Sequence, residues 1–172
     1  MWKGSGGVLE QATPEADDAA VAALIVDYLT GAIRRLKDEY GLTEAPTDLG
    51  SIRSSLQAFR PPNGSLIVAR TDGELVGVGA LRTLAPGVAE VKRMYVAPQW
   101  RGRRLGSAIL DRLIDEARDS LAAKIVRLDT VRFMKDAQYL YGSRGFVERS
   151  PYEGTEIPPQ LQEYWRFFEK EL

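Results

Sequence analysis

The sequence has 172 residues, the size of one folded domain, and its 23 basic and 24 acidic side chains nearly cancel, which argues against a dedicated nucleic-acid binder. It contains neither cysteine nor histidine, which excludes disulfides, thiolate or imidazole metal ligands and a Ser-His-Asp triad. Proton transfer in any active site must therefore use Asp, Glu, Tyr, Lys, the backbone or water.

The sequence carries no recognisable membrane or export signal. No apolar run approaches the ~18 residues of a membrane span, and residues 1–7 lack the apolar region of a signal peptide. We therefore expect a cytoplasmic location, with neither a membrane nor a nucleic acid as partner.

Hydrophobic periodicity and turn residues predict eleven elements. Strands are expected at residues 8–11, 66–69, 75–81, 90–96, 125–129, 146–148 and 165–169. Helices are expected from 14 to about 41 and at 49–59, 105–118 and 136–141. The element order β-α-α-β-β-β-α-β-α-β-β predicts an α/β (α+β) fold with a mixed, mostly antiparallel sheet of six to seven strands and helices on both faces. We expect one domain over residues 1–172, with residues 1–7 flexible.

Local signals set several of these boundaries. Thr13 precedes Pro14 and is expected to cap the first helix with its hydroxyl. Thr47 and Asp48 are expected to cap the second helix. The dipeptide at 72–73, Asp-Gly, is a hairpin turn signal between two strands.

The segment from residue 90 to residue 110 is the most informative part of the chain. A strand ends at Val96, Pro98 stops the ladder because it has no amide donor, and Gly102 and Gly106 open a helix. The start of a helix offers unpaired amides and a partial positive charge, which together bind anions. Three arginines add positive charge beside it: Arg101, Arg103 and Arg104. The segment therefore predicts a phosphate-binding loop.

Three other interpretations of this loop compete. A plain strand-to-helix connection would not need two glycines and three arginines. A nucleoside-triphosphate loop requires Lys-Ser or Lys-Thr after its last glycine, whereas Ser107-Ala108 follows here. A dinucleotide site is favoured by Asp129 at the end of the next strand, but the Gly-x-Gly-x-x-Gly pattern is absent.

Two motifs resemble those of the GNAT superfamily of acetyltransferases. Residues 99–104, Gln-Trp-Arg-Gly-Arg-Arg, are similar to its Gln/Arg-x-x-Gly-x-Gly/Ala signature. Residues 137–146, Ala-Gln-Tyr-Leu-Tyr-Gly-Ser-Arg-Gly-Phe, resemble its second motif, Ala-x-x-Leu-Tyr-x-x-x-Gly-Phe. The resemblance covers nearly the whole chain and looks like a bacterial branch. Arg104 departs from the Gly or Ala of the first motif. Its backbone N–H remains, so the loop still binds an anion if Arg104 is helical, and its side chain must turn outward.

The resemblance implies transfer of an acyl group, usually acetyl, from acetyl-CoA as cosubstrate to an amine, without a metal. In the family the pantetheine arm pairs with the end of the fourth strand, where a backbone N–H polarises the thioester carbonyl. The pyrophosphate lies on the amides of the loop and helix start. The implied CoA-binding residues are Met94, Tyr95, Val96, Arg101, Gly102, Arg103, Arg104, Leu105, Gly106, Ser107 and Tyr141.

The same resemblance nominates two catalytic residues. Tyr141 is the expected general acid for the leaving thiolate, and its other interpretation is a packed aromatic side chain. Glu90 is the expected base, and its other interpretation is a strand glutamate that pairs with Lys92 or Arg93. Because Cys and His are absent, we expect direct attack by the amine rather than an acyl-enzyme.

The acceptor is expected to be an amine of a small molecule or peptide. We expect its site between residues 36–60 and the loop 149–163, and the aromatic residues expected to line it are Tyr40, Phe59, Tyr152 and Tyr164. Lys92 and Arg93 could attract an anionic acceptor or simply form a polar strand face. A homodimer is compatible with the sequence. The alternative function is a catalytically inactive, CoA-binding sensor or interaction module.

Overall fold

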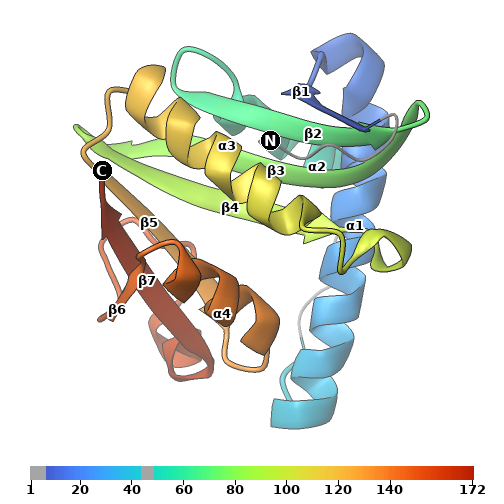
Figure 1. The fold of residues 1–172 in the computed structure, drawn as a ribbon. Coiled ribbons are helices and arrows are strands. Elements are labelled where there is room, and N and C mark those ends of the chain that lie inside the picture. Colours follow the sequence, from blue (N-terminus) through green and yellow to red (C-terminus); the bar gives the residue numbers. More distant parts are fainter. Residues whose placement is uncertain (1–6, 44–48) are drawn as a thin grey trace.

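A computed structural model describes residues 7–43 and 49–172 of the chain. These residues form one seven-stranded sheet of order β1-β2-β3-β4-β5-β7-β6 (Figure 1). The strands are β1 (Gly7–Gln11), β2 (Gly64–Thr71), β3 (Glu74–Ala85), β4 (Val88–Val96), β5 (Ile125–Val131), β6 (Val147–Arg149) and β7 (Trp165–Glu171). The helices are α1 (Pro14–Tyr40), α2 (Leu49–Ser55), α3 (Leu105–Asp119) and α4 (Lys135–Ser143). Short 3₁₀ helices are η1 (Leu56–Phe59), η2 (Pro98–Trp100) and η3 (Pro159–Tyr164). The predicted order and the mixed sheet are confirmed, since β4–β5 is the parallel pair and the other neighbours are antiparallel.

The predicted boundary signals have different outcomes. Asp72 and Gly73 both have positive φ, 49° and 82°, as a two-residue hairpin turn requires. The expected cap by the Thr13 hydroxyl is wrong: that hydroxyl makes no capping hydrogen bond. The side chain of Asp17 instead accepts a hydrogen bond from the Thr13 amide at 2.7 Å. The expected caps at Thr47 and Asp48 lie outside the described residues, as do residues 1–6 of the expected flexible segment 1–7, whereas Gly7 begins β1.

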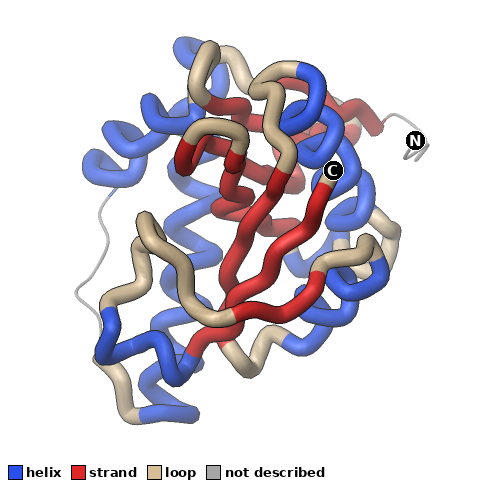
Figure 2. The backbone as a smooth tube through the Cα atoms, turned by 90° about the vertical axis from the view of Figure 1, so that its left-hand side faces the viewer, coloured by secondary structure: helices blue, strands red, loops and turns tan. Residues whose placement is uncertain are grey.

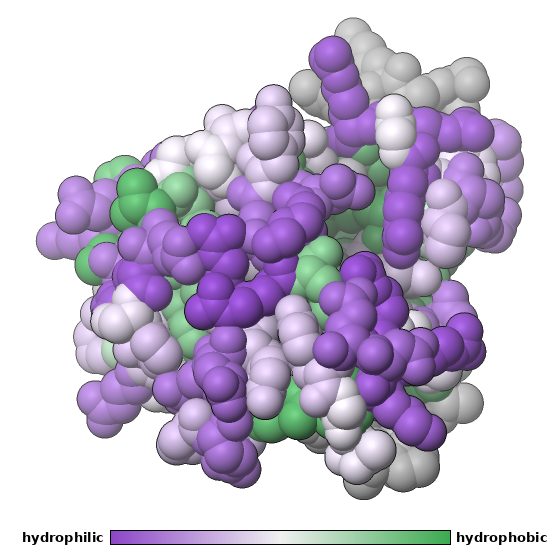
Figure 3. All heavy atoms as spheres, turned by 90° about the horizontal axis from the view of Figure 1, so that it is seen from below, coloured by the Kyte–Doolittle hydropathy of each residue, from purple (hydrophilic) through white to green (hydrophobic). Residues whose placement is uncertain are grey.

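Helices cover both faces of the sheet (Figures 1 and 2). Because successive strand residues point to opposite faces, Ile67 and Ala69 on β2 pack in the cluster under α3 and α4, whereas Leu66 and Val68 pack in the cluster under α1 and α2. The face seen from below is mostly hydrophilic with small hydrophobic areas (Figure 3), as expected when apolar side chains fill these two clusters. No helix within the described ranges is long and apolar enough to cross a membrane.

The strands β4 and β5 separate soon after they pair. Their register joins only Val88–Glu90 to Ile125–Arg127, and beyond these residues the two ribbons diverge (Figure 1). On its other side β4 carries an extra residue, because Ala80 pairs with Lys92 but Val78 pairs with Tyr95. Arg93 lies in this bulge with a φ of 54°. The sheet is therefore opened at its centre, beside an irregular strand.

Close packing of α3 on β3 gives a first testable prediction. A β-carbon at Gly79 would lie 2.5 Å from Ile109 Cγ2 and 2.8 Å from Leu113 Cδ1, so Gly79→Ala should lower the free energy of unfolding by about 1–3 kcal/mol. Gly31 is the matched control, since it is exposed within α1 and a β-carbon there meets nothing within 4 Å. Gly31→Ala should raise the free energy of unfolding by about 0.5–1 kcal/mol through helix propensity. Urea denaturation measures both, and a Gly79→Ala variant as stable as the wild type would contradict the packing.

Candidate functional site

A cavity of about 310 Å³ lies where β4 and β5 separate. Its walls come from α1, β4, β5, α4 and the segment that leads into η3. The apolar part of the wall includes Leu29 and Ile33 of α1 and Leu161 of η3. The charged and phenolic lining residues are Tyr28, Lys92, Arg93, Asp129, Tyr141 and Glu156.

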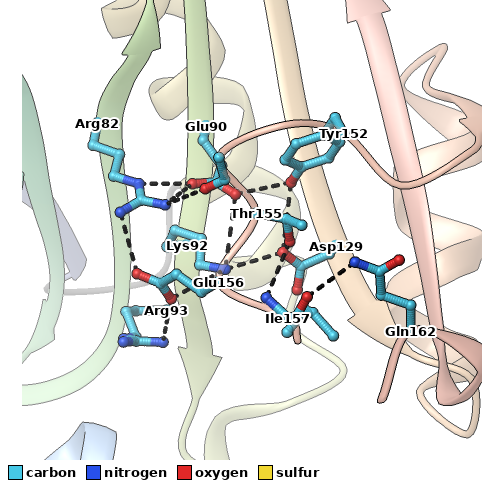
Figure 4. A network of polar contacts seen from close by, with 11 residues as sticks. Arg82, Glu90, Lys92, Arg93, Asp129, Tyr152, Thr155, Glu156, Ile157 and Gln162 are labelled. Carbon is cyan, nitrogen blue, oxygen red and sulfur yellow. Dashed lines mark hydrogen bonds and ion pairs between the residues drawn. The ribbon is translucent and has the colours of Figure 1, made fainter. Parts of the chain in front are cut away.

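A network of charged side chains holds one side of this cavity together (Figure 4). Lys92, which is buried, lies with its Nζ 3.0 Å from Asp129 Oδ2, 3.4 Å from Glu156 Oε2 and 3.8 Å from Glu90 Oε1. Arg82 contacts Glu90 Oε2 at 2.6 Å and Glu156 Oε1 at 3.2 Å. The network therefore ties β3, β4, β5 and the loop after β6 to one another.

Burial and charge act in opposite directions on two members of this network. Burial by itself lowers the pKa of Lys92, but the carboxylates of Asp129, Glu90 and Glu156 outweigh it and raise that pKa above its ordinary value. Burial raises the pKa of Glu156, but Lys92 and the nearby arginines outweigh it and lower that pKa. Both side chains are therefore charged at neutral pH.

Glu90 lies beneath the cavity rather than on its wall. Its side chain is fully buried, and one carboxylate oxygen takes a hydrogen bond from the Arg82 Nε at 2.7 Å. The other oxygen takes one from the Tyr152 hydroxyl at 2.8 Å. Burial, followed by the charges of Asp129 and Glu90, raises the pKa of Tyr152 well above its ordinary range. This hydroxyl therefore stays protonated and donates the hydrogen bond to Glu90. The pairing of Glu90 with cations agrees with its structural interpretation, since Lys92, one of the two expected partners, lies 3.8 Å away, and Arg82, which was not expected, is closer at 2.6 Å.

Tyr141 reaches the cavity from α4. Its ring packs against Phe146 and Phe168, with ring centroids 6.1 Å and 6.0 Å away. Burial, followed by the neighbouring Tyr28 hydroxyl and the charge of Asp129, raises the pKa of Tyr141 well above its ordinary value. Its hydroxyl is therefore protonated at physiological pH. The ring is packed, as its other interpretation expects, and the residue also lines the cavity, while its role as general acid stays a prediction.

The start of α3 has the predicted form of an anion site. No side chain caps the helix, and the first amides of a helix have no acceptor within it. Ala108 is the first residue of this turn whose amide reaches a carbonyl, that of Arg104 at 3.1 Å. The amides of Leu105, Gly106 and Ser107 are therefore placed to bind an anion at the positive end of the helix dipole.

Arg104 differs from the expectation. It is not helical but left-handed, with φ 61° and ψ 15°, although its side chain is exposed as expected. The backbone turns sharply before α3, and Gly102 also has a positive φ of 75°. Glycine adopts this geometry without strain, which gives a physical reason for Gly at the sixth motif position.

The other two arginines of the loop make local contacts. Arg101 donates a hydrogen bond to the Val96 carbonyl at 3.0 Å and lies over the Tyr95 ring at 5.4 Å. Arg103 lies over the Trp100 ring at 4.7 Å and is otherwise exposed. Both remain beside the helix start, where their charge favours an anion.

The end of β4 offers backbone groups to the opening. Met94, Tyr95 and Val96 follow the residues that pair with β5, so the edge facing β5 has no strand partner there. Met94 lines the cavity, together with Tyr141 from the opposite side. An extended ligand could therefore add to this edge and reach Tyr141.

The aromatic residues expected around the acceptor do not line this cavity. Tyr40 and Tyr164 pack on each other with ring centroids 4.9 Å apart. Phe59 is buried under α2, and Tyr152 is held in the charged network. The expected loop does contribute, through Glu156 and its neighbours.

Tyr28 and the cavity role of Asp129 were not predicted from the sequence. A signal existed for both. Tyr28 lies one helical turn before Ala32 on the apolar stripe of α1. Asp129 lies near the end of a strand whose parallel neighbour carries the phosphate loop, which is where ligands bind in open sheets.

Comparisons with known proteins add evidence from sequence and overall fold. The model of the Acetyltransferase (GNAT) family matches residues 30–146. The chain is 37% identical over 98 residues to the IAA acetyltransferase of Azospirillum brasilense, covering 56% of this chain and 63% of that protein. It is 32% identical over 133 residues to the amino-acid acetyltransferase of Mycobacterium tuberculosis, covering 76% of this chain and 68% of that protein.

The fold has close counterparts among solved structures. One is yncA from Salmonella typhimurium, solved with its cofactor acetyl-CoA. Its TM-score is 0.71 at 19% identity, and the match covers 98% of this chain and 95% of the other. Because the family model matches well over half of the sequence, the chain belongs to the GNAT family of acetyltransferases.

Proposed function

We propose that this protein transfers an acetyl group from acetyl-CoA to the amine of a small molecule or peptide by direct attack. The observation that carries the proposal is that the free edge of β4, the hydroxyl-bearing Tyr141 and the charged residues Asp129 and Glu156 meet at one cavity. Family membership supports both the reaction and the cosubstrate. The cytoplasmic location and the homodimer stay predictions.

Two parts of the backbone fit acetyl-CoA. The amides of Leu105 to Ser107 fit its pyrophosphate, since they point out of the start of α3 next to positive charge. The unpaired edge of β4 at Met94 to Val96 fits its pantetheine arm. A backbone N–H on that edge would then hydrogen-bond the thioester oxygen and stabilise its developing negative charge.

The reaction needs a neutral amine beside the thioester. The nitrogen lone pair forms a bond to the carbonyl carbon, the carbon–sulfur bond breaks, and sulfur leaves with the electron pair. The pKa of Glu156 is lowered, which suits it to attracting an ammonium but makes it a weak base. We therefore assign loss of the amine proton to water at the mouth of the cavity.

Tyr141 assists the leaving sulfur by donating a hydrogen bond. A phenol with an ordinary pKa of ~10 is a weaker acid than a thiol with one of ~8.5, so full proton transfer to the thiolate costs about 2 kcal/mol. The raised pKa of Tyr141 increases this cost. A hydrogen bond to the sulfur stabilises the departing charge without that cost.

Removal of one amide from the helix start tests the phosphate site. Gly106→Pro deletes a backbone N–H in the first helical turn, where proline is tolerated. It should weaken CoA binding about 10- to 100-fold, the value of one hydrogen bond to a charged group. Gly106→Ala keeps the amide, and its β-carbon would meet only Leu140 Cδ2, at 3.8 Å. It should bind CoA as the wild type does in calorimetry, and equal affinity of the proline variant would contradict the assignment.

Tyr141→Phe should lower kcat about 10- to 100-fold while CoA affinity stays nearly constant, because the hydrogen bond acts on the leaving sulfur. The loss should shrink when the acetyl donor is a thioester of a more acidic thiol, since that thiolate needs less stabilisation. Tyr139→Phe is the control, because Tyr139 lies on the same helix but is 82% exposed. Stopped assays of thiol release with both donors measure the effect. The same loss with both donors would reduce Tyr141 to a positioning residue, and an unchanged rate would favour the inactive CoA-binding module.

Glu90→Gln separates a structural role from the expected role as base. If Glu90 holds Arg82 and Tyr152, the variant should lose about 3 kcal/mol of unfolding free energy, because buried cations lose their counter-charge. The pH dependence of kcat/KM should keep its shape. Glu74→Gln, at an exposed position on β3, should change neither property. A stable Glu90→Gln enzyme whose rate falls ~10²–10⁴-fold with an altered pH profile would instead establish Glu90 as the base.

A further inference from the structure

Arg93 is the least satisfied cation around the cavity. Its Nε is buried and has no hydrogen-bond acceptor among residues 7–43 and 49–172. Its nearest acidic contact is 3.7 Å, from NH1 to Glu156 Oε2, which is too long for a hydrogen bond. Arg82 and Lys92, by contrast, have carboxylate oxygens at 2.6 Å and 3.0 Å. A buried guanidinium nitrogen without an acceptor is costly, and a ligand can supply the missing oxygen.

The bulge in β4 places Arg93 at the cavity. Arg93 lies at the extra residue of the strand, with a left-handed φ of 54°, and its side chain lines the cavity beside Tyr28 and Glu156. Non-glycine residues held at positive φ cost about 1–3 kcal/mol and cluster at ligand sites. The position therefore keeps a fork of N–H donors beside the cavity.

Carboxylates lie on the same cavity. Asp129 and Glu156 both line it, and the lowered pKa of Glu156 keeps that side chain negative at neutral pH. These groups attract the ammonium form of an amine as it enters. The cavity thus offers positive charge and negative charge within one small volume.

The rest of the wall is apolar. Leu29, Ile33 and Leu36 come from α1, and Leu161 and Trp165 lie toward the end of the chain. The volume of about 310 Å³ is at the lower end of the ~300–1,000 Å³ typical of small-molecule sites. A compact molecule with one apolar group therefore fits better than an oligosaccharide or a long polyamine.

We propose that the acceptor is an α-amino acid with an apolar side chain, whose carboxylate is bound by Arg93 while its amine faces Asp129 and Glu156. This inference rests on the proposed acetyltransferase function and names its substrate class. The amine nitrogen forms the new bond to the acetyl carbon, the thiolate of CoA leaves, and the amine proton goes to water. The product amide carries no charge at nitrogen, so its attraction to the two carboxylates ends and release is favoured.

Charge balance supports a zwitterion over other amines. The cluster pairs three cations with three carboxylates: Arg82, Lys92 and Arg93 with Glu90, Asp129 and Glu156. An amino acid adds no net charge, and each of its ends meets the opposite sign. A polyamine or aminoglycoside would bring several positive charges next to Lys92 and Arg93. A peptide N-terminus has no carboxylate beside its amine.

The test compares acceptors that differ only in the carboxylate. Thiol release from acetyl-CoA is measured with leucine, with 3-methylbutylamine, which is leucine without its carboxylate, and with leucinamide. Each rate is corrected for the fraction of neutral amine. We expect kcat/KM for leucine to exceed that of both analogues at least 100-fold. Lysine, spermidine and a short peptide complete the panel, and each should be a poorer acceptor than leucine.

Arg93 variants connect this preference to one side chain. Arg93→Gln should lower kcat/KM for leucine about 10- to 100-fold, and the loss with 3-methylbutylamine should be at least tenfold smaller. Arg93→Lys keeps the charge but not the planar fork, so it should recover only part of the loss. Arg118→Gln removes the same charge from α3, at an exposed ion pair with Asp115, and should change neither acceptor.

Distinct outcomes overturn distinct claims. Equal kcat/KM for leucine and 3-methylbutylamine, or an equal loss with both in Arg93→Gln, would overturn the acceptor class and leave the acetyltransferase function intact. A better rate with spermidine or the peptide would do the same. No thiol release with any member of the panel, while calorimetry shows bound CoA, would overturn the proposed function together with this inference.

Discussion

The early separation of β4 from β5 is the constraint on which the rest of the site depends. A parallel pair that ends after three residues leaves backbone groups and side chains facing a gap in the middle of the sheet. The gap must be filled either by the protein or by a ligand, because buried polar groups need partners. Here the protein fills one part with charged side chains and leaves the remainder as the cavity.

Filling that gap with charged side chains costs free energy, because the charges must leave water. Hydrophobic residues of similar size often replace a buried ion pair without loss of stability, so stability alone does not account for it. The network joins β3 and β4 to β5 and to the loop that carries Tyr152 and Glu156. It therefore fixes the angle between the two halves of the sheet and positions the loop that closes one side of the cavity.

Local chemistry made much of the fold predictable. Positive φ at Asp72 and Gly73 follows from the turn dipeptide alone, and helical periodicity gave α1 and α3 within a few residues. The uncapped start of α3 was also predictable, because its free amides follow from the backbone, and its role as an anion site stays a prediction.

The features that could not be predicted depend on contacts between residues that are far apart in the sequence. The hydrogen bonds of Glu90 could not be predicted, because Arg82 and Tyr152 approach it from another strand and a distant loop, and its role as base stays a prediction. The left-handed conformation of Arg104 was missed because arginine, unlike glycine, rarely adopts a positive φ. The position of Tyr28 at the cavity could not be predicted, because helical periodicity does not show which part of a 27-residue helix faces the gap.

The two proposed substrate sites consist of different kinds of protein surface. The proposed donor site consists of main-chain groups at the start of α3 and the edge of β4, and substitutions that keep the main chain leave these groups unchanged. The proposed acceptor site consists of side chains on α1, β4, β5 and the loop after β6. A few substitutions there could redirect the enzyme to a new amine while its use of the shared donor continues. Evolution or protein engineering can thus change the acceptor site without changing the donor site.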